Sequence, residues 1–145
     1  MNHELIMLRE LKRMHEMSQS LAKEARYRAI RSHSSLNVKN GTMGQIEEIC
    51  RLIQLRDDCL RFCIAANDAF NAIDNDKRWL LQQYYIKSVS VDVIADSLKA
   101  TPVSVYNKLY MARMQFKNAL NKYGYTEQWF RENFTHFDFI AARLV

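Results

Sequence analysis

Hydrophobic residues in the first half of the chain recur at the three- and four-residue spacings of long helices. From Leu5 to about Ser34 the apolar stripe contains Met7, Leu11, Met14, Leu21 and Ala25, with a polar gap at Ser18. After a turn-rich stretch, SSLNVKNGTMG, the pattern resumes from Ile46 to Ile73. We therefore predict two long helices in an antiparallel hairpin, the second of about 28 residues and about 42 Å.

The second of these helices is apolar on more sides than one hairpin can bury. Its expected seam consists of Ile46, Ile49, Ile53, Arg56, Leu60, Cys63, Asn67 and Phe70. The apolar surface beside this seam is extended by Cys50, Leu55, Phe62 and Ile64. We expect self-association through the hairpin to give a homodimer, with polar Arg56 and Asn67 fixing the register at some cost in stability. The alternative is a monomer in which the hairpin packs on the second half of the chain.

The pattern over residues 76–116 predicts three helices separated by two short breaks. Ser90 precedes an apolar-periodic run and is a good N-cap residue. Thr101 can cap the next helix, and Pro102 suits its first position because the amide hydrogen that proline lacks would have no partner there. Only two residues separate the second and third helices, so we expect them to cross at a steep angle, as in a helix-turn-helix.

The stretch YYIKSVSVDVIADSLKATPVSVYNKLYMARMQF resembles region 4 of bacterial sigma factors and the related phage late-gene activators of the ArpU and RinA kind. Members of this family have a tyrosine-rich first helix, an s-x-x-x-IA-x-x-L second helix, Ser or Thr opening the third and a closing alanine. The matching residues here are Tyr84, Tyr85, Ser90, Ile94, Ala95, Leu98, Thr101 and Ala112. The resemblance covers a little under a quarter of the chain, residues 84–116 of 145, and implies a DNA-binding helix-turn-helix.

The chain departs from the family pattern in two ways. The family often has Gly in the turn, whereas this chain has Lys99, for which a left-handed backbone costs roughly 1 kcal/mol. A family recognition helix also usually carries Arg or Lys on its outer face. Here that face is mostly apolar, and it lies opposite the expected core positions Val105, Leu109, Ala112 and Phe116.

A DNA-binding role would require the third helix to read base edges in the major groove. Asn107 can bond adenine bidentately, Ser104 can bond a base edge, and Val103 can contact a thymine methyl. The basic residues would contact phosphates. The alternative for the basic residues is a solvated face without a ligand. The residues assigned to DNA contact are Thr101, Val103, Ser104, Tyr106, Asn107, Lys108, Arg113, Lys117, Lys77 and Arg78.

The chain ends in an aromatic-rich tail after Gly124, which can terminate the third helix. So much aromatic surface is expected to be covered, either by the chain's own helices or by another protein. If the tail covered the outer face of the third helix, DNA reading would be blocked. The residues of a possible protein-partner surface are Tyr110, Met111, Met114, Trp129, Phe130, Phe134 and Phe137.

Charge is distributed unevenly along the chain, whose net charge is +5. Residues 77–125 hold eight basic and two acidic residues, and residues 1–40 hold eight and four. Residues 41–76, in contrast, hold three basic and seven acidic residues. Basic charge therefore concentrates in the predicted helix-turn-helix and in the first helix, as expected for a nucleic-acid-binding protein.

Catalytic and metal-binding chemistry find little support in the sequence. Cys59 and Cys63 lie four apart, the histidines are scattered, and no spacing typical of a zinc site occurs. The three cysteines are interpreted as small buried or half-buried hydrophobic residues. Adjacent acids point to different helix faces, and no glycine-rich phosphate loop is present. We expect neither an enzyme, nor a metal site, nor a cofactor.

Together these patterns predict an all-α protein. The expected parts are a helical hairpin for self-association over residues 1–73, a helix-turn-helix over residues 74–123 and an aromatic tail over residues 124–145. No signal peptide or membrane span is recognisable, so we expect a cytoplasmic protein.

Two functions are consistent with this organisation. The first is a phage or mobile-element transcription regulator that binds double-stranded DNA, with RNA polymerase as a further partner. The second is an inhibitor or adaptor that binds a host or phage protein, such as an antirepressor, an anti-CRISPR protein or a polymerase-appropriating factor.

Overall fold

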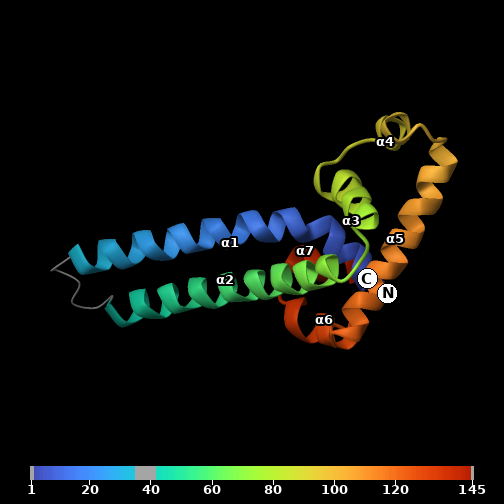
Figure 1. The fold of residues 1–145 in the computed structure, drawn as a ribbon. Helices are drawn as coiled ribbons and strands as arrows, with labels where there is room; N and C mark the ends of the chain where they lie inside the picture. The colour runs from blue at the N-terminus through green and yellow to red at the C-terminus, as the bar shows by residue number, and fades with distance from the viewer. Residues whose placement is uncertain (1, 35–41, 145) are drawn as a thin grey trace. The chain divides into compact units, whose positions relative to one another are not determined.

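The protein is all-α, as predicted from the sequence. The computed structural model describes residues 2–34 and 42–144, and no strand occurs within these ranges (Figure 1). No helix in the described ranges is both long enough and apolar enough to cross a membrane. The elements are α1 (His3–Ser34), α2 (Thr42–Asn71), α3 (Asn75–Leu81), the π-helix η1 (Gln82–Ile86), α4 (Val91–Leu98), α5 (Pro102–Lys122), α6 (Glu127–Phe134), α7 (Asp138–Ala141) and the 3-10 helix η2 (Ala142–Leu144).

The chain forms two compact units. One consists of residues 13–63, and the other combines residues 1–12 with residues 64–145. In the first unit the two long helices run antiparallel to each other (Figure 1), and Arg28 of α1 comes within 4.0 Å of Glu48 of α2. Most of the predicted turn-rich stretch between these helices lies outside the described residues.

The first unit buries one side of each long helix. On α1, Met14 and Ala25 of the predicted stripe are buried and Leu21 is half-buried, and Ser18, the predicted polar gap, is buried as well. On α2 the buried positions are Leu52, Asp58, Cys59 and Phe62. The predicted seam through Ile46, Ile53 and Leu60 therefore does not face α1, and all three side chains are exposed.

Helix α2 thus has two apolar sides, of which the hairpin covers one. The sequence pattern did not distinguish them, because residues on both sides repeat every seven positions. Two further residues of the predicted seam have other surroundings. Arg56 is half-buried and its Nη2 lies 2.9 Å from Asp57 Oδ1. Phe70 is buried, with its ring centroid 4.9 Å from that of Phe116, and so it is unavailable for self-association.

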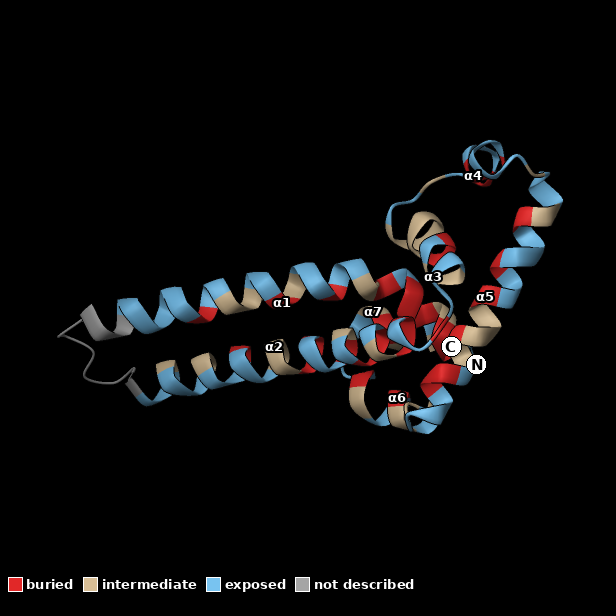
Figure 2. Ribbon diagram, in the orientation of Figure 1, coloured by how far each residue is buried: buried red, intermediate tan, exposed pale blue. Residues whose placement is uncertain are grey.

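The second unit contains the aromatic core of the protein. Figure 2 shows buried positions along one side of α5 and within the tail. Val105, Leu109, Ala112 and Phe116 are buried, as the predicted core face of α5 requires. Both α3 and α4 pack on α5.

The helix starts predicted from the sequence are present. Ser90 Oγ accepts a hydrogen bond from Val93 N at 3.3 Å, and Thr101 Oγ1 accepts one from Ser104 N at 3.2 Å. Pro102 occupies the first turn of α5. In Figure 1, α4 is seen nearly end-on while α5 runs across the view, so the two helices are steeply inclined.

Lys99 ends α4 in the left-handed conformation, with φ 53° and ψ 44°. Its amide donates to the carbonyls of Ala95 and Asp96, and the amide of Ala100 donates to the carbonyl of Ala95 at 2.9 Å. These bonds hold a lysine where glycine would fit without strain. The tight connection between α4 and α5 is therefore made at a conformational cost.

The tail packs on the start of α1 and the end of α5. His3 Nε2 lies 3.1 Å from the carbonyl oxygen of Tyr125. Because a carbonyl can only accept, Nε2 is assigned the proton and donates this hydrogen bond. The centroid of the His3 ring lies 6.1 Å from that of Phe130. At the other end of the tail, Arg143 Nε donates to Glu10 Oε1 at 2.6 Å. Residues more than 120 positions apart are thus joined in one core.

The cysteines differ in their surroundings. Cys59 is buried and Cys63 is half-buried, and burial raises the pKa of the Cys59 thiol to about 11 and also raises that of Cys63. Both fit the predicted role of small hydrophobic residues. Cys50, in contrast, is exposed, so the prediction is wrong for this residue.

We predict that Lys99→Gly stabilises the protein by roughly 0.5–1 kcal/mol, because glycine removes the strain of the left-handed backbone but adds unfolded-state entropy. Lys99→Ala is the matched control, since it removes the charged side chain and keeps the Cβ atom. Urea unfolding measures both. Equal stability of the two variants would contradict strain at this position.

We also predict that His3 makes stability depend on pH. Burial lowers the pKa of His3 below its ordinary value of 6.5, partly offset by Glu4 and the Tyr125 carbonyl. The unfolded chain therefore takes up the proton first, so stability is full above pH 6.5 and falls as the pH drops below it. His3→Gln retains an N–H donor but does not titrate. The free energy of unfolding of this variant should therefore fall less than that of the wild type between about one pH unit above and one pH unit below 6.5. An unchanged slope would contradict this role.

Candidate nucleic-acid interface

The outward face of α5 is open in the second unit. Val103 is 69% exposed, Tyr110 is 54% exposed and Met111 is 58% exposed. Asn107 and Lys108 are also exposed. The tail leaves this face uncovered, because its own aromatic residues pack on other parts of the same unit.

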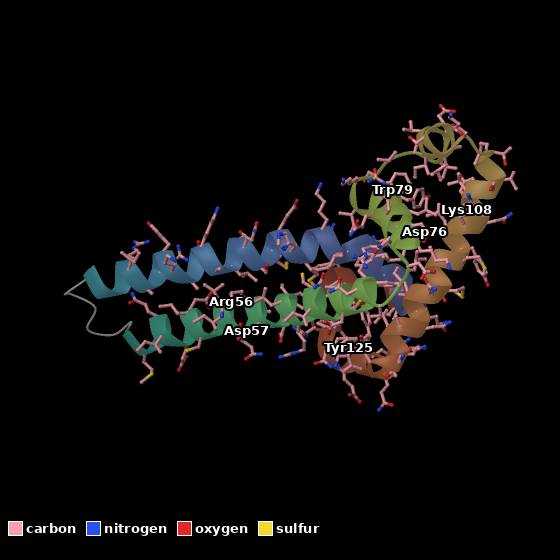
Figure 3. The ribbon with its side chains drawn as sticks, viewed as in Figure 1. Arg56, Asp57, Asp76, Trp79, Lys108 and Tyr125 are labelled. Carbon is pink, nitrogen blue, oxygen red and sulfur yellow. The ribbon has the colours of Figure 1, made fainter. Side chains whose placement is uncertain are left out.

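One side of this face borders a groove of about 540 Å³ between α3, the end of α4 and α5. Figure 3 labels three of the residues that line it, Asp76, Trp79 and Lys108. Its complete lining is Asp76, Lys77, Trp79, Leu80, Leu98, Ser104, Asn107, Lys108 and Met111. The groove brings together four of the predicted DNA contacts: Lys77, Ser104, Asn107 and Lys108.

The other side of the face borders a hollow of about 310 Å³. It is lined by Arg9, Tyr84, Tyr85, Tyr106, Leu109, Tyr110 and Arg113. The guanidinium carbon of Arg113 lies 5.7 Å from the centroid of the Tyr110 ring, within range of a cation–π contact. Two more predicted DNA contacts, Tyr106 and Arg113, belong to this hollow.

Hydrogen bonds fix the groove wall formed by the start of α3. Asp74 accepts bonds from Lys77 Nζ at 3.2 Å and from Gln115 Nε2 at 3.4 Å. Its backbone amide donates to Gln115 Oε1 at 3.3 Å. The bonds from Lys77 and Gln115 lower the pKa of the Asp74 carboxyl. The start of α3 is therefore tied to the middle of α5.

Two arginines present a different case, because part of each guanidinium group is removed from water. Arg78 and Arg113 are both half-buried. Among the residues that the structure describes, their Nε atoms are buried without a hydrogen-bond partner. A buried donor without an acceptor is costly, so neither Nε atom stabilises this arrangement, and any contact with an outside ligand would have to be made by other atoms of the two side chains.

The remaining predicted DNA contacts are placed as follows. Thr101 is exposed, and its hydroxyl already caps α5. Lys117 is half-buried and is close enough to His3 to contribute to the lowered pKa of that imidazole. Lys117 therefore belongs to the tail end of α5 and lies away from the groove.

The predicted protein-partner surface divides into two groups. Tyr110 and Met111 are exposed, while Met114 and Trp129 are half-buried. The other residues, Phe130, Phe134 and Phe137, are buried. Phe134 packs on Trp129 and Phe130, Phe130 lies near His3 at the start of α1, and Phe137 packs on Phe139. These three phenylalanines cannot contact a partner in this fold.

Several residues of the site were not found from the sequence. Arg9 comes from α1, and its place beside Arg113 depends on tertiary folding. Trp79 and Leu98 line the groove, although the sequence indicated no role for Trp79 and placed Leu98 only in the apolar pattern of its helix. The π-helical turn holding Tyr84 and Tyr85 left no signal beyond the tyrosine pair itself.

Within the described ranges, no three His, Cys, Asp or Glu residues are grouped in a way that could hold a metal ion. Comparisons with protein-family models, curated proteins and solved structures found no match to this chain.

Proposed function

We propose that this protein is a DNA-binding transcription regulator of phage or mobile-element origin, with α4 and α5 acting as a helix-turn-helix similar to sigma factor region 4. The observation that carries the proposal is the open face of α5, with exposed Asn107 and Lys108 beside a groove that Lys77 also lines. An α-helix with its side chains, about 10–12 Å across, matches the major groove of B-DNA, about 12 Å wide.

In this proposal each group on α5 has a separate task. Asn107 would accept and donate hydrogen bonds to an adenine edge, and Val103 would contact a thymine methyl. Lys77 and Lys108 on one side of α5, and Arg113 on the other, would bind the phosphates that border the major groove of the DNA. Phosphate contacts on both sides of α5 would fix the rotation of this helix in the major groove of the DNA.

The distribution of charge supports this arrangement. Residues 77–125 carry an excess of basic over acidic residues, eight against two. The acidic residues Asp74 and Asp76 lie on α3 or at its start, and Asp74 is paired with Lys77. DNA binding would therefore have to compete with this ion pair, which is exposed and hence weak.

A second candidate function is supported by the apolar character of the same face. Val103, Tyr110 and Met111 are exposed, and Trp79 and Leu98 add apolar lining to the groove. Exposed apolar side chains gathered in this way are typical of protein-binding surfaces. In this alternative the protein would be an inhibitor or adaptor that binds a host or phage protein through α5.

We predict that the Asn107→Ala, Lys108→Ala double variant binds DNA more weakly than the wild type. Losing one phosphate contact should reduce the salt dependence of binding by about one unit of slope, and losing a base contact should cost roughly 1–3 kcal/mol on a cognate site. Fluorescence anisotropy with genomic DNA fragments at about 50 and 200 mM salt measures both effects.

Lys122→Ala is the matched control, since Lys122 is an exposed lysine in the last turn of the same helix. It lies 14 residues from Lys108, or about 21 Å along α5. If the control loses as much affinity as the double variant, binding is diffuse and the proposed face is not the site. If the wild type does not bind DNA even at the lower salt, the regulator proposal fails and a protein partner is favoured.

A further inference from the structure

The second apolar side of α2 remains uncovered in the first unit. It forms a continuous row, here termed the α2 stripe, made of Met43, Ile46, Cys50, Ile53, Asp57 and Leu60. Met43 is 69% exposed and Ile46 is 48% exposed. Cys50, Ile53 and Leu60 are also exposed, and Asp57 is half-exposed.

The α2 stripe has the spacing of a coiled-coil seam. Its members follow one another at intervals of three, four, three, four and three residues, so they lie on one side of the helix. The buried positions Leu52, Cys59 and Phe62 lie on another side, toward α1. A heptad seam on an exposed helix is the surface that a second helix of the same repeat covers.

We propose that the α2 stripe pairs with the α2 stripe of a second copy of this chain, in antiparallel orientation. The size of the side chains favours this orientation. Ile46, Ile53 and Leu60 alternate with Met43, which is of similar size, and with the smaller residues Cys50 and Asp57. In an antiparallel pair Cys50 faces Ile53 and Asp57 faces Ile46, so the four inner layers have a similar volume, and Met43 faces Leu60 at the two ends.

Charge favours the same orientation. In a parallel pair Asp57 would face Asp57 of the partner within the seam, and two carboxylates there repel each other. In an antiparallel pair each Asp57 faces an apolar residue and keeps its own Arg56, whose Nη2 lies 2.9 Å away. Glu47 and Arg61 flank the stripe on one side near its opposite ends, so antiparallel pairing brings Glu47 toward Arg61 of the second copy.

This pairing differs from the seam expected from sequence in its position on the helix. Ile46, Ile53 and Leu60 belong to both seams. Cys50 and Asp57 replace Ile49 and Arg56 as the residues between them. The pairing is independent of DNA binding, because none of its residues belongs to α5 or to the groove.

Sedimentation equilibrium tests the pairing directly. The wild type should sediment as a dimer, with twice the 17.1 kDa mass of one chain. Ile53→Glu and Leu60→Glu should each raise the dimer dissociation constant at least roughly a hundredfold, because each buries two unpaired carboxylates in the dimer. Circular dichroism should show that both variants remain helical, since both side chains are exposed in the single chain.

Ile30→Glu is the matched control. Ile30 is 61% exposed and lies on α1 of the same unit, so the change is chemically identical but lies outside the α2 stripe. The control should remain dimeric. A monomeric wild type, or a dimer that survives Ile53→Glu and Leu60→Glu, would overturn the proposal.

Pulsed electron paramagnetic resonance tests the orientation. A spin label on Met43→Cys, at the end of the stripe, is placed in a background with Cys50→Ala and Cys63→Ser, and this labelled protein is first shown to sediment as a dimer. The label should report a separation of about 26 Å between the two copies, because Met43 lies opposite Leu60 of the second copy and about 17 residues at about 1.5 Å each separate the two positions along the helix axis. A separation of about 10 Å would mean that the helices run parallel and would overturn the antiparallel assignment.

Discussion

Burial of the aromatic tail against the first residues of α1 is the interaction on which the second unit depends. His3 bonds the Tyr125 carbonyl and packs near Phe130, while Arg143 bonds Glu10. These contacts place the apolar surface of the tail, which would otherwise be exposed, in the protein's own core. They also keep the tail away from the outward face of α5. The openness of that face is thus a consequence of where the tail packs.

The two exposed surfaces to which we assign partners belong to helices that have more apolar positions than their own unit can bury. Helix α5 turns Val105 and Ala112 inward and leaves Met111 exposed, whereas α2 turns Leu52 and Cys59 inward and leaves a second seam exposed. Since apolar surface of this kind is costly in water, each surface is expected to have a partner. DNA is the partner that we propose for α5, and a second copy of the chain is the one that we propose for α2.

Local chemistry was predictable from sequence, whereas the choice among competing faces was not. Ser90 and Thr101 cap their helices because capping depends only on the residue and its nearest neighbours. The inward face of α2 could not be chosen, because its apolar residues repeat at the same interval on both sides. The groove beside α5 was also missed, because Trp79 and Leu98 reach it from different helices and only tertiary packing brings them together.

Oxidative footprinting of side chains, with and without DNA, tests the proposed use of the α5 face most directly. Tyr110 and Met111 should be protected by DNA. Tyr27 and Tyr123 are internal standards with an exposure similar to that of Tyr110, and their oxidation should not change. If DNA protects all four residues equally, or protects only Tyr27 and Tyr123, then α5 is not the DNA-binding helix and its open face does not bind DNA.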